Sequence, residues 1–79
     1  MGVRLGDQWM LTTEHPASSY GQPVLIDEDG EPVGPGDMVS GGSGVVMLAA
    51  DLVSRLAQHA DLDADGRAMV ARFCGLLEQ

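Results

Sequence analysis

GVVMLAADLVSRLAQH, residues 44–59, has the clearest periodicity in the chain. Its apolar side chains recur at intervals of three and four residues, with polar side chains between them, which is the pattern of an amphipathic helix. The apolar positions are Val45, Leu48, Ala49, Leu52, Val53 and Leu56. We therefore predict a helix over residues 44–59, capped at its start by Ser43 or Ser40.

A second helix is predicted after a short acidic turn, beginning near Asp63 or Asp65. A carboxylate at this position accepts hydrogen bonds from free amide groups and suits the positive end of a helix. The apolar stripe of this helix consists of Met69, Phe73, Leu76 and Leu77, widened by Val70 and Cys74. The two helices are expected to form a helical hairpin over residues 40–79.

The first part of the chain, residues 1–39, is predicted to consist of strands and loops. Val3, Leu5, Trp9 and Leu11 occupy alternate positions on either side of Gly6-Asp7, which predicts a hairpin. A second hairpin is expected from the apolar run 24–26 to Val33, with a two-residue turn at Asp29-Gly30. Pro32 cannot donate a ladder hydrogen bond, so the returning strand is predicted to be an edge strand.

Together these elements predict an α+β fold. A small antiparallel sheet of two hairpins is followed by a two-helix hairpin that packs on one face of the sheet. A chain of 79 residues is enough for one domain, which we expect to span residues 1–79. A domain of this size has a thin core that gains from association, so we also expect a homodimer.

Charge is the most unusual bulk property of the chain. Twelve acidic residues stand against four arginines and no lysine, for a formal net charge of −8, and no basic residue falls between Arg4 and Arg55. The densest group of acids is Asp27, Glu28, Asp29, Glu31 and Asp37. Since this charge repels phosphate, direct binding to nucleic acid is disfavoured, and these residues are predicted to bind a basic protein surface. The alternative is that they only keep a small protein soluble.

The single cysteine, Cys74, cannot form an internal disulfide and is predicted to be a small buried apolar side chain. The sequence begins without a cationic, apolar leader, and no apolar run approaches the ~20 residues that cross a bilayer. We therefore expect a cytoplasmic protein that does not bind membranes.

No pattern of residues predicts catalysis or a cofactor. Ser18 or Ser19 beside His15 lacks a specified oxyanion loop and orienting acid, and His59 is predicted to lie near a helix end, where a cation is favoured. Residues 41–44 (GGSG) could hold an anion at a helix start, but they lack the ending of a phosphate-binding loop, so a flexible linker is favoured. The sequence therefore predicts a protein that is not an enzyme.

Residues 61–66 (DLDADG) have the alternate acidic positions and the glycine that open a calcium-binding loop. A calcium-binding module would use Asp61, Asp63 and Asp65. However, the position that should supply a bidentate glutamate is occupied by Arg72. A helix-capping acidic turn is therefore favoured, and calcium binding is the alternative.

In its short reading frame, acidic excess and lack of catalytic residues, the chain resembles small phage-encoded inhibitors, including anti-CRISPR proteins. The resemblance implies a protein that occupies a basic nucleic-acid-binding surface of a Cascade or Cas effector and blocks access of DNA. It also implies that the acidic residues between 27 and 37 mimic phosphate charges, inside the cytoplasm of a bacterial host. The competing function is a small homodimeric adaptor or structural protein.

Overall fold

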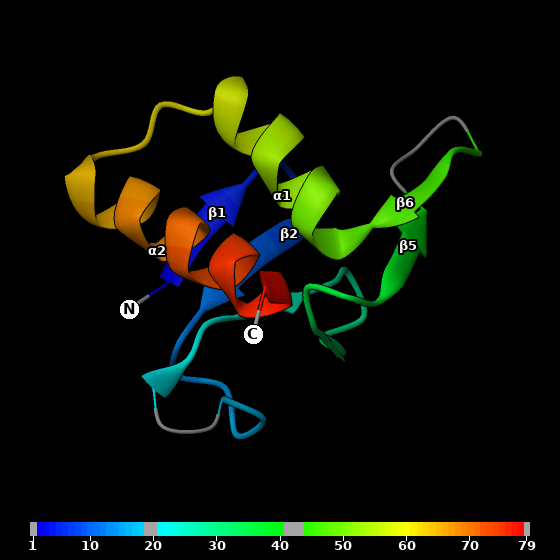
Figure 1. The fold of residues 1–79 in the computed structure, drawn as a ribbon, viewed down its shortest axis with the longest axis horizontal. Helices are drawn as coiled ribbons and strands as arrows, with labels where there is room; N and C mark the ends of the chain where they lie inside the picture. The colour runs from blue at the N-terminus through cyan, green and yellow to red at the C-terminus, as the bar shows by residue number, and fades with distance from the viewer. Residues whose placement is uncertain (1, 19–20, 41–43, 79) are drawn as a thin grey trace.

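The computed structural model describes residues 2–18, 21–40 and 44–78, which form an α+β fold (Figure 1). A four-stranded antiparallel sheet has the order β1-β2-β3-β4, and a second sheet has two strands, β5 and β6. The strands are β1 (Gly2–Leu5), β2 (Trp9–Thr12), β3 (Val24–Ile26), β4 (Pro32–Val33), β5 (Met38–Ser40) and β6 (Val46–Leu48). They are followed by α1 (Ala49–Gln58), α2 (Ala64–Gly75) and the 3-10 turn η2 (Leu76–Glu78).

The predicted first hairpin is confirmed. Leu5 pairs with Trp9 and Val3 pairs with Leu11, so the alternating apolar side chains share one face of the sheet. The connection between the strands contains Gly6 with a φ of +78°, a conformation that glycine adopts without steric cost. This hairpin brings Trp9 to the end of the sheet beside the turn.

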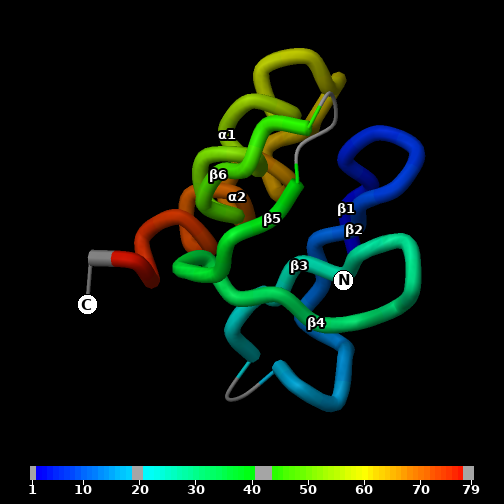
Figure 2. Tube along the Cα trace, turned by 90° about the vertical axis from the view of Figure 1, so that its right-hand side faces the viewer, coloured from blue at the N-terminus to red at the C-terminus, as the bar shows by residue number. Residues whose placement is uncertain are grey.

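Both helices lie against the same face of the four-stranded sheet, as predicted (Figures 1 and 2). The sheet contributes Leu5, Leu11 and Leu25 to the core, one from each of three adjacent strands. The helices contribute Leu52, Val53, Met69 and Phe73, all of which are buried against these leucines. The core is therefore a single layer of aliphatic side chains and one phenylalanine between sheet and helices.

The predicted extent of the first helix is wrong at its start. Residues 46–48 form β6, which pairs with β5 in the register Met38 with Leu48, and α1 begins only at Ala49. The N-cap of α1 is Leu48, which supplies no side-chain hydrogen bond. Of the two predicted caps, Ser40 lies in β5, and Ser43 is outside the described residues. Adjacent β-branched valines favour a strand here, and the strand has a partner across the glycine-rich segment.

The predicted two-residue turn of the second hairpin is also wrong. The amide of Gly30 donates to the carbonyl of Asp27 over 3.0 Å, and the amide of Asp27 donates to the carbonyl of Glu31 over 3.1 Å. Gly30 has a φ of +80°. The connection is therefore a three-residue loop, residues 28–30, which ends on a glycine in the left-handed region. The prediction for Pro32 is confirmed, because β4 is an edge strand.

Candidate functional site

The acidic loop, residues 27–31, is held in shape by one of its own carboxylates. Oδ1 of Asp27 accepts hydrogen bonds from the amides of Asp29 and Glu31, both over 2.9 Å. Glu28, Asp29 and Glu31 are exposed. The loop therefore presents three charged side chains on a backbone that the fourth acidic residue fixes.

Asp37, the fifth predicted site residue, plays a similar structural part between β4 and β5. Its Oδ2 accepts a hydrogen bond from the amide of Gly34 over 2.8 Å. Its backbone carbonyl accepts from the amide of Ala49 over 2.8 Å, which links this turn to the start of α1. Asp37 thus holds the turn between β4 and β5 against the start of α1, and its side chain is exposed.

A groove of about 320 Å³, here called the Trp9 groove, lies between the acidic loop and β5. Its apolar lining comes from Trp9, Val33, Met38 and Val39, and its carboxylates come from Asp27, Glu28 and Asp37. The structure therefore brings three of the five predicted residues to one groove. Asp29 and Glu31 do not line it.

Arg4 lies closer to the acidic loop than the sequence indicates. An adjoining hollow of about 240 Å³ is lined by Arg4 together with Asp27 and Glu28. The guanidinium of Arg4 donates to the backbone carbonyl of Asp7 over 3.5 Å. A cation distant in sequence therefore lies beside the loop, because β1 pairs with β2 and β2 pairs with β3, the strand that precedes the loop.

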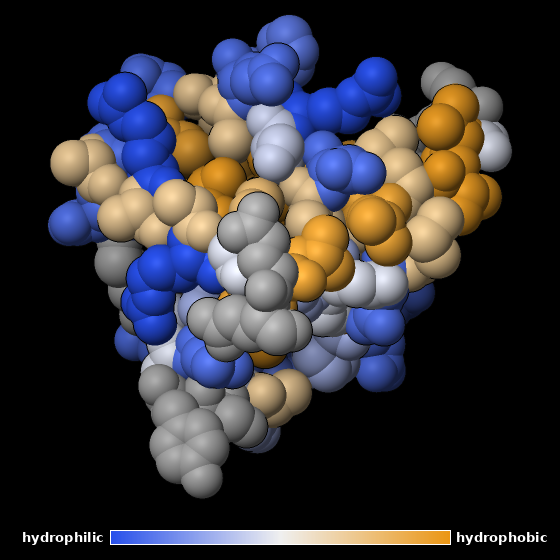
Figure 3. All heavy atoms as spheres, viewed as in Figure 1, coloured by the Kyte–Doolittle hydropathy of each residue, from blue (hydrophilic) through white to orange (hydrophobic). Residues whose placement is uncertain are grey.

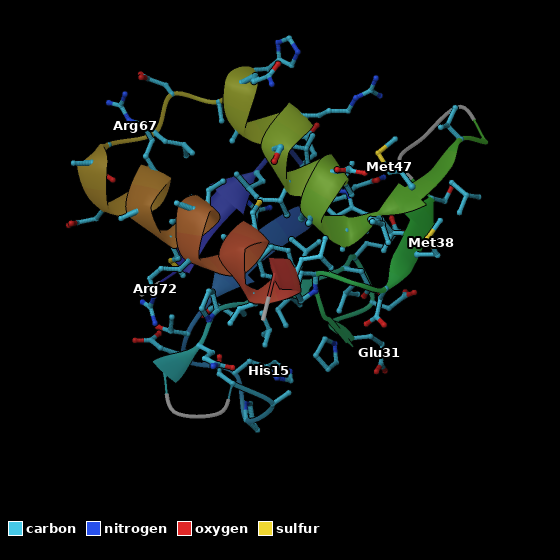
Figure 4. All side chains as sticks on the ribbon, in the orientation of Figure 1. His15, Glu31, Met38, Met47, Arg67 and Arg72 are labelled. Atoms are coloured by element: carbon cyan, nitrogen blue, oxygen red, sulfur yellow. The ribbon has the colours of Figure 1, made fainter. Side chains whose placement is uncertain are left out.

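Arg67 and Arg72 lie away from the acidic loop. In Figure 4 Glu31 is at the lower right, whereas Arg67 and Arg72 are at the left. The guanidinium of Arg72 donates to the carbonyl of Gly21 over 2.9 Å. Arg67 and Arg72 thus lie on a different side of the molecule from Glu31.

The predicted acidic turn before the second helix is confirmed as a cap. Asp63 is the N-cap of α2, and its Oδ1 accepts a hydrogen bond from the amide of Gly66 over 2.8 Å. Over residues 2–18, 21–40 and 44–78, no three histidine, cysteine, aspartate or glutamate side chains gather as ligands of a metal ion would. Asp61, Asp63 and Asp65 are exposed, with Asp63 engaged in the cap.

The remaining chemistry-bearing residues have local structural contacts. Nδ1 of His15 accepts from the amide of Ala17 over 3.0 Å, and His59 is the C-cap of α1, as predicted. Cys74 packs against the core as a small apolar side chain, as predicted, but is only half-buried, and its Sγ lies 3.4 Å from Oγ of Ser54. Residues 41–43 of the GGSG segment are outside the described residues, and Gly44 precedes β6 instead of a helix.

One candidate surface was missed by sequence reasoning. Met38, Val45 and Val46, here called the β5–β6 face, are exposed by 59%, 51% and 61%. Figure 3 shows apolar side chains gathered over β5 and β6. The available signal was the absence of any charged residue between Met38 and Ala50, which is unusual in a chain with so many acids. The helical pattern of residues 44–59 obscured it.

Comparisons with protein-family models, with curated proteins and with solved structures found no match. Among the described residues, no helix combines the length and the apolar character needed to cross a membrane.

Proposed function

We propose that this protein acts by binding and not by catalysis, and that its acidic loop occupies a basic nucleic-acid-binding surface of a partner protein. By its resemblance to anti-CRISPR proteins, the partner would be a Cascade or Cas effector in the cytoplasm of a bacterial host. The bound loop would block access of DNA to that surface. Neither a cofactor nor direct contact with nucleic acid is required.

The observation that supports this proposal most is the conformation of the acidic loop. The two hydrogen bonds to Oδ1 of Asp27 hold the backbone while Glu28, Asp29 and Glu31 remain exposed. A loop that is ordered before binding loses less conformational entropy when it docks. Because its charges are exposed and of one sign, they attract a basic surface over a distance of about 8–10 Å at physiological salt.

The test compares two baits in bacterial lysate, the wild-type protein and a variant in which Asp27, Glu28, Asp29 and Glu31 are replaced by Asn or Gln. At low salt the wild type should retain nucleic-acid-binding proteins, and labelled DNA should compete with it for them. The neutral variant and high salt should both release these proteins. Equal retention of the same proteins by both baits at both salt concentrations would overturn the proposal.

A second candidate function is supported by the β5–β6 face. Met38 and Val46 are more than half exposed, and residues 38–50 carry no charge, so this surface suits an apolar interface. A homodimeric adaptor would bury it against a second copy of the chain. Since such an interface depends little on ionic strength, binding that persists in high salt would favour this function over charge mimicry.

A further inference from the structure

We propose that the Trp9 groove receives one arginine side chain of the basic partner. This inference rests on the proposed function and deepens it, because it places the contact with the partner between the acidic loop and β5. It also separates the acidic residues that contact this arginine from those that only attract the partner through long-range electrostatics.

The groove has the two surfaces that an arginine requires. Trp9 and Val33 are half-buried and present apolar surface, and Met38, which is 59% exposed, also lines the groove. The three methylene groups of an arginine pack on such surface, and its planar guanidinium stacks on an indole ring. Methionine adapts its shape to the side chain that it contacts.

The charges of the groove select a cation. Asp27, Glu28 and Asp37 line it, and no basic side chain is among the described residues that do so. Asp27 and Asp37 already accept amide hydrogen bonds at one oxygen each, whereas Glu28 is exposed and takes no part in the hydrogen bonds that hold the loop. Glu28 is therefore the carboxylate best placed to bind a guanidinium with both oxygens.

The same features disfavour other occupants. An anion would be repelled by three carboxylates, and a purely apolar side chain would remove them from water without a partner. Lysine supplies the charge, but its ammonium group neither stacks on an indole nor binds a carboxylate through two parallel hydrogen bonds. The groove should therefore prefer arginine to lysine.

Glu28 and Glu31 provide a matched pair of variants. Both are exposed residues of the same loop, and Glu28→Gln and Glu31→Gln remove the same charge, but only Glu28 lines the groove. The probes are hexaarginine and hexalysine peptides, titrated into the full-length protein at low salt. Since Trp9 is the single tryptophan of the chain and lines the groove, its fluorescence reports occupancy directly.

We expect hexaarginine to bind the wild type more tightly than hexalysine and to change the emission of Trp9. Glu28→Gln should weaken hexaarginine about fivefold to tenfold, and Glu31→Gln less than about twofold. Equal losses of hexaarginine affinity in the two variants, or equal wild-type affinity for both peptides, would overturn the proposal of an arginine site in the groove. Either result would leave charge-based binding by the loop intact. If neither peptide binds the wild type at low salt, the proposed function itself fails.

Discussion

At the scale of single residues, the acidic side chains between residues 27 and 37 serve two different purposes. Asp27 and Asp37 accept hydrogen bonds from backbone amides of their own turns, and Glu28, Asp29 and Glu31 are exposed. Each hydrogen bond from a carboxylate to a backbone amide contributes about 1 kcal/mol to folding, whereas an exposed carboxylate without such bonds contributes little. Substitutions of Asp27 or Asp37 that remove the acceptor oxygen should therefore lower stability, whereas neutralising Glu28, Asp29 or Glu31 should change only the charge.

Replacing Asp27 by Ala should lower the free energy of unfolding by about 1 to 2 kcal/mol, because two amides lose their acceptor. Asp27→Asn keeps an acceptor oxygen at the same position and should stay within about 0.5 kcal/mol of the wild type. Urea denaturation followed by circular dichroism measures both. If Asp27→Ala is as stable as Asp27→Asn, the side chain does not hold the loop.

The second residue-scale prediction concerns the turn before α2. Asp63→Ala should cost about 1 kcal/mol of stability, and Asp63→Ser, which keeps an N-cap oxygen, should restore most of it. Millimolar calcium should leave the thermal midpoint of the wild type unchanged, because the Asp63 oxygen caps the helix and Arg72 donates to a backbone carbonyl. A midpoint that rises with calcium would restore the calcium-binding alternative.

The acidic group could be predicted from the sequence, but not which of its carboxylates accept backbone hydrogen bonds and which remain exposed. The order of residues shows directly that five carboxylates fall between residues 27 and 37. Which of them accept amide hydrogen bonds depends on the type of turn, and Asp29-Gly30 is compatible with more than one type. The Trp9 groove requires β5 beside the acidic loop, a contact between segments that local patterns do not specify.

At the scale of elements, the region around residues 44–48 shows how local periodicity misleads. Val45 and Leu48 have helical spacing with Leu52, but residues 45–48 (VVML) are also a short, continuous apolar run, which is equally typical of a strand. A run of this length is too short to decide between a helix and a strand from the sequence alone. The partner strand β5 decides it, and Met47 faces the core while Val46 is exposed.

The β1–β2 hairpin and the start of α2 were predicted correctly, whereas Leu76 and Leu77 of the predicted helical stripe lie in η2, where Leu77 is exposed. The β1–β2 hairpin follows from four alternating apolar side chains around a glycine turn, and α2 follows from an aspartate cap and the buried Met69 and Phe73. In these cases the side-chain pattern and the local capping or turn residues favour the same structure. The start of α1 had no such agreement, since its N-cap is a leucine.

The exposed β5–β6 face predicts weak self-association. In sedimentation equilibrium at tens of micromolar, roughly where a micromolar dimer is populated, the wild type should exceed the mass of an 8.3 kDa monomer. Met38→Ser combined with Val46→Thr should shift the protein to monomer, and Leu77→Ser, which changes an exposed apolar residue outside this face, should not. A wild type that is monomeric throughout would remove the support for a homodimeric adaptor.

At the scale of the whole molecule, the acidic loop and the β5–β6 face lie on different elements, and Met38 belongs both to this face and to the Trp9 groove. The acidic loop joins β3 to β4, the β5–β6 face lies on the second sheet, and the helices cover one face of the first sheet (Figure 2). Because the loop lies outside the core formed by Leu11, Leu25 and Phe73, its charge can change without disturbing the packing. Binding and folding should therefore respond independently to neutralisation of the loop.

The most direct test is the salt dependence of hexaarginine binding, measured for the wild type and for the variant with Asp27→Asn, Glu28→Gln, Asp29→Asn and Glu31→Gln. Wild-type affinity should fall steeply as ionic strength rises from about 0.01 M to about 0.15 M, as the screening length shortens from about 30 Å to about 8 Å. The variant should bind weakly at every salt concentration, with a thermal midpoint close to that of the wild type. Equal affinity and equal salt dependence in the two proteins would contradict the account.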